Sequence, residues 1–402
     1  MIRSEPMPPE HPAPSPRRSL LPLLAAMAAL APLSMHLFAP VLPVVRDAFA
    51  VPQALVQLSI SLPLLAMAPA TLVYGPAADR YGRRPVLVAA LLVFLAGATV
   101  AGTAVNIWLL MAGRMLQAVG GIGALVLART IVSDRNAASE LASKLATLTM
   151  VMVIAPLIAP LVGGLLAEHV SWRALFALLA LVGVTLLGAV IRRLPETRPP
   201  AAPGARIRRG RLAELVVHRA FMAYALQNAM VTATFLTFVA GAPTVFADAL
   251  GRGPAEFGRY FAAVAVAYLV GNFIASRVST RVGSRRMVTG ASVAALLAAI
   301  AALALAAAGV QTPWSLVGPM VVVVLCAGLS NPNAQAGAIS AFPQAAGAAS
   351  GGLTFLQNLT GAVATQLVGM FPATSTVPVA ALLVLFSTLS LASLALLPRA
   401  AR

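Results

Sequence analysis

The sequence predicts an all-α membrane protein with twelve transmembrane helices, arranged as two pseudo-symmetric bundles of six. Its residues are 60% hydrophobic and only 10% charged, whereas soluble proteins carry about 25% charged residues. Long uncharged runs recur along the chain, each close to the roughly 17–25 residues that cross the hydrocarbon of a bilayer. The stretch DRYGRR (79–84) also has an echo, TRVGSRR (280–286), half a chain length later. Such an echo is expected if a six-helix unit is duplicated.

The apolar runs are expected to be helices because unpaired backbone amides are not tolerated in lipid. Residues 1–19 precede the first run and are rich in proline, so they are expected to form a disordered tail. The expected spans cover residues 20–45, 53–75, 85–105, 107–130, 142–166, 172–192, 219–246, 257–278, 287–309, 314–336, 346–370 and 376–397.

The basic residues orient these spans. They gather in the tail, in the loops after the second, fourth and eighth spans, in the central segment and at the C-terminus. The exceptions are Arg46, Arg173, Arg252 and Arg259, which fall on the opposite side, and Arg114, which lies within a span. Because positive residues stay on the cytoplasmic side, both termini are expected there. The net charge of +17 therefore indicates orientation and contact with anionic lipid, not nucleic-acid binding.

The spans and the basic residues together predict the domain organisation. A bundle over 20–192 is expected to be joined by a cytoplasmic linker, 193–218, to a second bundle over 219–397, with a short cytoplasmic tail at 398–402. Cys326 is the single cysteine and lies in an apolar run, so neither a disulfide nor a thiolate metal site is predicted. No metal and no cofactor is expected.

The stretch GPAADRYGRRP (75–85) is the most specific signal. Glycines at its bends permit close helix approach and a tight turn, its aspartate can cap a helix, and its arginines hold the loop inside. Six of its residues are expected to form a conformational latch at the cytoplasmic helix ends: Gly75, Asp79, Arg80, Gly82, Arg83 and Arg84.

This stretch resembles the conserved loop of the major facilitator superfamily. Three further segments are similar to the bicyclomycin/chloramphenicol-resistance (Bcr/CflA) branch of drug:proton antiporters, and the resemblance spans nearly all of the chain. They are GRMLQAVGG (113–121), APLIAPLVGG (155–164) and NAQAGAISAFPQAAGAASG (333–351). The resemblance implies the major facilitator fold, a monomer in a bacterial inner membrane, and multidrug efflux that confers antibiotic resistance.

The fifth span carries the motif that the resemblance connects with antiporters, formed by Pro156, Pro160, Gly163 and Gly164. The prolines each remove a helical hydrogen bond and bend the span, and the glycines let another backbone approach closely. The resemblance implies that this span packs against a helix of the other half and helps to set the outward/inward equilibrium.

Arg114 and His36 are the expected proton-coupling residues. Both lie roughly 6 Å to the periplasmic side of the middle of their spans, at about 1.5 Å per residue. In the resembled branch an aspartate and a tyrosine occupy the positions of His36 and Phe38. All eleven acidic residues fall in the tail, in loops or at helix ends, so His36 is the group deep in the membrane that titrates near neutral pH. The alternatives for His36 are a substrate contact and a structural hydrogen bond, for example with Ser34.

A substrate pocket is expected between the halves, near the middle of the membrane. It would contain amides but no anion, which favours neutral, zwitterionic or anionic compounds that face Arg114 over dicationic ones. The candidate pocket residues are Phe38, Gln117, Gln227, Asn228, Tyr268, Asn272, Gln357 and Asn358.

The predicted function is therefore secondary transport and not enzymatic catalysis. The chain is expected to export drug-like small molecules by alternating access, in exchange for protons. Two alternatives keep the fold: a dedicated exporter of an endogenous metabolite or siderophore, and an uncoupled facilitator or importer. A membrane-embedded enzyme has no support, since neither a metal-ligand cluster nor a nucleophile–base pair is visible in the sequence.

Overall fold

The computed structural model describes residues 20–136, 138–198, 215, 217–342 and 346–397. This part of the chain is helical and contains no strand. The helices are α1 (Leu21–Phe38), η1 (Ala39–Val41), α2 (Leu42–Phe49), α3 (Gln53–Tyr81), α4 (Arg83–Gly102), α5 (Ile107–Arg135), α6 (Ala138–His169), α7 (Ala174–Arg193), α9 (Arg219–Asp248), α10 (Pro254–Val282), α11 (Ser284–Ala307), α12 (Pro313–Ser340), α13 (Ala346–Gly369), α14 (Val377–Ser393) and η3 (Leu394–Leu396).

Within the described residues, 11 helical segments are long and apolar enough to cross a membrane, with α1, η1 and α2 counted together as one. The remaining predicted span, 346–370, corresponds to α13, which has 24 residues but contains the polar side chains of Gln357, Asn358 and Gln366. Several helices run past the predicted span: α3 continues to Tyr81 and α5 to Arg135, because their last turns are charged and extend beyond the apolar run. The all-helical prediction is confirmed.

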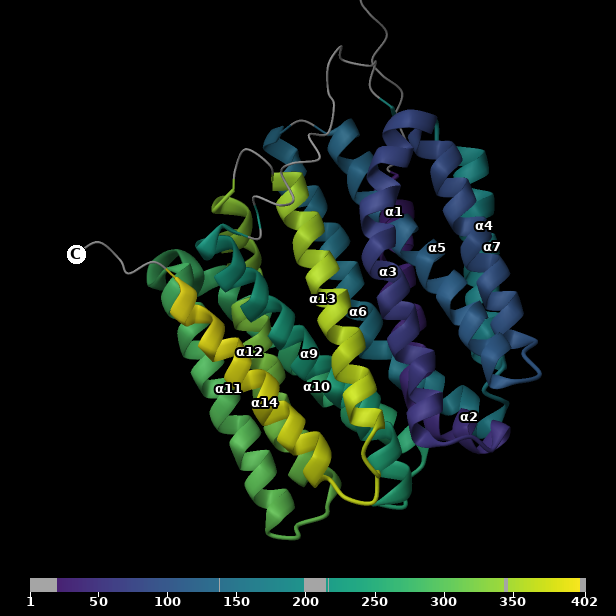
Figure 1. Cartoon of the computed structure of the whole chain (residues 1–402). Helices are drawn as coiled ribbons and strands as arrows, with labels where there is room; N and C mark the ends of the chain where they lie inside the picture. The colour runs from purple at the N-terminus through teal and green to yellow at the C-terminus, as the bar shows by residue number, and fades with distance from the viewer. Residues whose placement is uncertain (1–19, 137, 199–214, 216, 343–345, 398–402) are drawn as a thin grey trace, which may run out of the picture.

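The helices form two bundles with the same internal packing. In the first bundle α4 and α3 pack on α5, and α1 packs on α6. The second bundle repeats these contacts, with α11 and α10 on α12, and α9 on α13. In Figure 1 the first bundle, purple to blue, stands beside the second, teal to yellow. The predicted pair of six-helix bundles is therefore the observed architecture.

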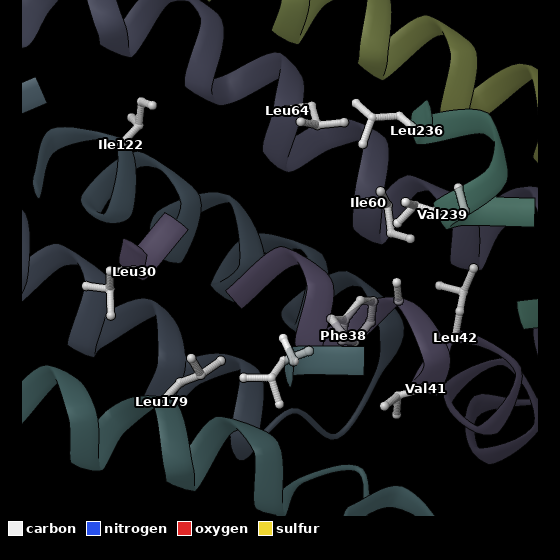
Figure 2. Close-up of a cluster of buried hydrophobic side chains, with 14 of the residues drawn as sticks. Leu30, Phe38, Val41, Leu42, Ile60, Leu64, Ile122, Leu179, Leu236 and Val239 are labelled. Carbon is white, nitrogen blue, oxygen red and sulfur yellow. The ribbon is translucent and has the colours of Figure 1, made fainter. Parts of the chain in front are cut away.

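Two helix pairs join the bundles: α6 packs on α10, and α3 packs on α13. In Figure 1, α13 accordingly stands between α3 and α9. Figure 2 shows how the apolar core continues across this junction, where Leu64 of α3 lies next to Leu236 of α9, and Ile60 lies next to Val239. The halves thus share one buried hydrophobic cluster.

Each bundle has two ends, which we name by residues found there. At the Asp79 end α1 begins and α3 passes into α4; at the Asp248 end α2 follows α1 and α9 approaches α10. Between them, α4 and α5 cross with their backbones almost in contact. A methyl group at Gly97 would lie only 2.2 Å from the Gln117 backbone nitrogen. Arg114, about a quarter turn around α5 from this contact, faces α1 and α3.

Candidate functional site

Arg114 ties three helices of the first bundle together. The residue is only 2% exposed. Its Nη1 group donates to the Ser34 carbonyl oxygen of α1 (3.2 Å) and to Gln117 Oε1 (2.7 Å), and its Nε donates to the Ser59 carbonyl oxygen of α3 (3.5 Å). The guanidinium also lies 4.4 Å from the centre of the Phe38 ring. A buried cation is thus stabilised by oxygens and an aromatic face, and no described carboxylate pairs with it.

One side of this guanidinium stays open. Its Nη2 group donates no hydrogen bond to a described residue, and Arg114 takes part in lining a small cavity between α1, α3 and α5. The other lining residues are Ala31, Ser34, Met35, Ile60, Pro63, Leu64, Met67 and Ala118. A guanidinium edge in an otherwise apolar cavity can bind an acceptor oxygen.

His36 lies on the opposite face of α1 from the contacts of Arg114. It is two residues from both Ser34 and Phe38, and two residues turn an α-helix by about 200°. The imidazole is 5% exposed, its Nδ1 has no hydrogen-bond partner, and it packs against Phe235 and Phe261 of the second bundle, with ring centres 5.7 and 6.1 Å away. The structure therefore places His36 at the junction of the halves and Arg114 inside the first bundle, with no bond between them.

The predicted pocket amides divide into separate groups. In the second bundle Asn228 of α9 donates to Asn331 of α12 (2.9 Å) and accepts from Gln357 of α13. Asn358, the next residue of α13, has a buried Nδ2 atom without a partner. Asn331 was missed by the sequence analysis, although it is a polar residue within an apolar run. The result is an amide cluster of Asn228, Asn331 and Gln357.

The remaining predicted pocket residues lie elsewhere. Gln227 donates to Ser292 of α11 (3.2 Å), and Asn272 donates to the Tyr268 carbonyl oxygen within α10 (2.8 Å), where α10 crosses α12. Phe38 is fully buried and packs on Phe176 of α7 as well as under Arg114. Gln117 also belongs with Arg114. The structure thus does not gather the predicted pocket residues in one place.

The predicted latch residues meet acidic partners that the sequence analysis did not assign. Arg83 donates to Asp79 (2.5 Å) and to Asp134 at the end of α5 (2.9 Å). Glu196, which follows α7, accepts from the backbone N–H groups of Arg83 (2.9 Å) and Arg84 (3.2 Å). It caps the start of α4 from a distant part of the chain. Spacing alone could not give these partners, which depend on the fold.

The other latch residues have smaller roles in this structure. Gly82 has a positive φ of 99°, and a methyl group there would lie 2.7 Å from Glu196 Oε2. Arg84 donates to the Ile191 carbonyl oxygen, while Arg80 is exposed beside Tyr81. Nothing lies within 4 Å of the added methyl at Gly75. The contacts of Gly82 and Arg84 therefore join the start of α4 to residues at and after the end of α7, within the first bundle.

Glu196 gives a pH-dependent prediction. Partial burial raises the pKa of its carboxyl, but four backbone N–H groups, those of Arg83, Arg198, Arg84 and Thr197, outweigh burial and lower the pKa below the ordinary 4.5. The stabilisation is therefore present at neutral pH and is lost as the pH falls through the lowered value. Glu196→Gln is expected to cost about 1 kcal/mol of unfolding free energy, the usual value of a helix cap.

The measurement is thermal unfolding of the purified protein between pH 7 and pH 3. The melting temperatures of the two proteins should differ at pH 7 and converge as the wild type loses its carboxylate. Glu256→Gln is the control, since Glu256 pairs only with Arg252 on the surface (3.4 Å), and this variant should change stability by under about 0.5 kcal/mol. A pH-independent difference for Glu196→Gln would contradict the role of the charge.

The glycines of the α6 motif lie against backbone on two sides. A methyl group at Gly163 would lie 2.1 Å from the Leu37 carbonyl oxygen of α1, and one at Gly164 would lie 2.4 Å from the Pro254 carbonyl oxygen of α10. Gly258 of α10 lies equally close to α6, since a methyl group there would be 2.7 Å from the Pro160 carbonyl oxygen and from the Leu161 Cα. The motif therefore sits at the contact between the halves. The side chain of Pro156 lies outside the described residues.

Polar contacts also join the halves at the Asp248 end. Arg46 of α2 forms a two-pronged ion pair with Asp248 at the end of α9, and its Nε donates to Asp47 (2.9 Å). The Glu168 carboxylate accepts from the Ala255 backbone N–H at the start of α10 (3.3 Å). The sequence places Arg46 in a loop and the acidic residues at loops or helix ends, but their pairing depends on the fold. This end of the molecule is closed between the bundles.

The sequence matches the model of one protein family, described as "Major Facilitator Superfamily", over residues 24–365. It is 30% identical to "Multidrug resistance protein D" of Escherichia coli (strain K12), over 89% of this chain and 90% of that protein. It is 29% identical to "Uncharacterized MFS-type transporter YdgK" of Bacillus subtilis (strain 168), over 94% of each, and 27% identical to "Chloramphenicol resistance protein" of Pseudomonas aeruginosa, over 89% of this chain and 85% of that protein.

Solved structures share the fold. A bacterial homologue of the human lysosomal transporter Spinster, in an inward-facing and occupied conformation, superimposes with a TM-score of 0.77 at 16% identity, over 96% of this chain and 97% of that one. A D-xylose-proton symporter gives a TM-score of 0.74 at 13% identity, over 92% and 96%. At such identities the likeness concerns the fold alone.

Proposed function

This chain belongs to the major facilitator superfamily, and on that premise we propose that it exports drug-like small organic molecules across the bacterial inner membrane by proton antiport. It is a membrane transporter and not an enzyme. The observation that carries efflux is the similarity over about nine-tenths of the chain to proteins named for multidrug and chloramphenicol resistance. The segments similar to the Bcr/CflA branch support the same assignment.

The proposed mechanism is alternating access between the two bundles. The pairs α6–α10 and α3–α13 are exchanged by the pseudo-symmetry of the fold, so one rocking motion can loosen both at one end and tighten both at the other. Arg80, Arg83 and Arg84 gather at the Asp79 end, which supports a cytoplasmic position for that end and for both termini. The Asp248 end would then face the periplasm, and the structure would be the state closed to the outside.

Two polar sites, one in each bundle, support the binding of small molecules. One is the amide cluster of Asn228, Asn331 and Gln357, which joins three helices of the second bundle. The other is the open edge of Arg114 in its cavity. Uncharged donors and acceptors with one cation suit a range of small molecules, and they do not require a single shape.

His36 is the proposed proton carrier. In the closed junction its ring packs on Phe235 and Phe261, and no described residue forms an ion pair or hydrogen bond with it. A charged imidazolium in this apolar contact would be costly. Protonation would therefore favour a state in which the junction at the Asp248 end is open and water reaches the ring.

We expect His36→Ala to abolish the stimulation of transport by a pH gradient and to leave the fold intact. The measurement is substrate flux in proteoliposomes with and without an imposed gradient, alongside thermal unfolding. His169→Ala is the matched control, because His169 is exposed at the end of α6. Undiminished proton coupling in a folded His36→Ala protein would end this part of the proposal.

A second candidate is transport without proton coupling. One observation favours it. The described carboxylates that form ion pairs or hydrogen bonds lie near the ends of the bundles, and none of them lies in the middle of a span. The same proteoliposomes separate the candidates. An uncoupled facilitator equilibrates its substrate at the same rate with or without a pH gradient and releases no protons. Comparison of the transport rates of drugs with those of an endogenous metabolite or siderophore then distinguishes the two classes of substrate.

A further inference from the structure

Acidic and basic side chains are distributed unequally in the molecule. Asp79 and Asp134 are held by Arg83, and Asp248 is held by Arg46. Glu168 and Glu196 accept from backbone N–H groups, and Glu256 pairs with Arg252. These described carboxylates are therefore already bound to donors near the ends of the bundles.

Arg114 and Arg129 of α5 have no such carboxylate partner. The contacts of Arg114 are with carbonyl oxygens, Gln117 and a ring. Arg129 is exposed, and among the described residues its polar contact is with the sulfur of Met152 on α6, at 3.8 Å. Neither forms an ion pair with any described carboxylate. The positive charges of Arg114 and Arg129 therefore stand without a counter-charge among the described residues.

The position of Arg129 on the helix connects it with the Arg114 cavity. It follows Ala118, which lines that cavity, by eleven residues, or about three helical turns, so both lie on nearly the same face of α5. Exposed Leu116 lies on a different face, roughly 140° away from Arg129. The two arginines are about 22 Å apart along the axis, so they can hold an anion in succession but not together.

We propose that the substrates are amphipathic organic anions, which meet Arg129 first, near the Asp79 end, and Arg114 next, in the cavity between α1, α3 and α5. This inference rests on the proposed efflux function and specifies its substrate class. Carboxylate, phosphate and sulfonate groups match the planar donors of a guanidinium. Unbalanced positive charge raises the local concentration of anions, and the carboxylates of Asp79 and Asp134 at that end are already paired with Arg83.

The test uses three aromatic probes of nearly equal size: naphthalene carboxylate, naphthalene carboxamide and naphthalene methylamine. Equilibrium exchange of each is measured in proteoliposomes of zwitterionic lipid, without any gradient, so that the result does not depend on proton coupling. The wild type should exchange the carboxylate with the highest kcat/KM. Arg129→Gln should raise KM for the carboxylate about tenfold, as expected for one lost charge-assisted hydrogen bond, and should leave the amide and amine unchanged.

Two variants sharpen the test. Arg129→Lys keeps the charge and should recover most of the affinity for the carboxylate. Arg192→Gln removes an exposed arginine at the end of α7 and should leave KM unaltered. The assay is repeated with anionic lipid in the vesicles, because a lipid phosphate is another source of the same chemistry. An Arg129→Gln effect that is seen only with anionic lipid would assign the residue to headgroups and overturn the proposal.

The remaining outcomes distinguish the inference from the function on which it rests. Exchange of the amine or the amide as fast as the carboxylate, or an unchanged KM in Arg129→Gln, would overturn the anionic substrate class and leave efflux standing. No exchange of these probes, nor of any drug or metabolite tested in the same vesicles, would overturn the transport proposal itself.

Discussion

Arg114→Met should lose transport by at least a hundredfold while changing stability by no more than about 2 kcal/mol. The variant loses two or three hydrogen bonds, worth about 1.5–3 kcal/mol each when one partner is charged, and a cation–π contact of about 2 kcal/mol. It also no longer buries an unpaired cation, which costs several kcal/mol. These contributions largely cancel, whereas the charged edge that faces the cavity has no replacement.

The measurement is substrate exchange in proteoliposomes at equal protein content, together with thermal unfolding of the same preparation. Arg114→Lys keeps the charge but has a single nitrogen in place of three, so it should fold and transport poorly. Gln117→Ala removes one partner of Arg114 and should have the smaller effect. Exchange above one-tenth of the wild-type rate in a folded Arg114→Met protein would show that the arginine only fastens helices.

Gly164→Leu should block the closing of the Asp248 end and abolish transport, although each bundle keeps its internal packing. A side chain here meets the Pro254 carbonyl oxygen of α10, because even a methyl group would lie 2.4 Å from it. Backbone atoms cannot move aside as a flexible side chain can. The two helices must therefore separate, and the α6–α10 junction cannot form as described.

Accessibility at the junction reports this separation. Phe235→Cys, in a Cys326→Ser background that has no other cysteine, should be labelled slowly from the periplasmic side by a membrane-impermeant maleimide. Addition of Gly164→Leu should increase that labelling rate about tenfold or more. Gly188→Leu is the control, since Gly188 of α7 has nothing within 4 Å of an added methyl. Equal labelling in the two glycine variants would contradict the assigned role of the α6–α10 contact.

The fold could be predicted because its determinants are local. Span length, charge distribution and the repeated DRYGRR stretch are all readable in short windows, and the helices follow them. The charged last turns of α3 and α5 were excluded because hydropathy does not show that a helix continues past the membrane. α13 is not among the eleven segments apolar enough to cross a membrane, because the amides of Gln357 and Asn358 lower its mean hydropathy.

The site was less predictable because its contacts cross between helices. Depth follows from counting residues along a span, so His36 and Arg114 could be placed at similar height. Their angular positions depend on how α1 packs against α5, where Gly121 lies close to Ala31. Gln117 is three residues from Arg114 and could be foreseen as its partner, whereas the Ser34 and Ser59 carbonyl oxygens could not. Phe38, expected in the pocket, proved to be core.

The Arg46–Asp248 ion pair has a consequence for turnover in different salt concentrations. Its side chains are 19% and 26% exposed, so water already solvates part of each charge. Pairs of this kind contribute about 1 kcal/mol or less and weaken as ionic strength rises. If the bundles rock as proposed, the free-energy difference between the closed and open conformations would reside mainly in the glycine–backbone contacts of α6 and α10, which salt does not screen, and a change in ionic strength should alter the transport rate little.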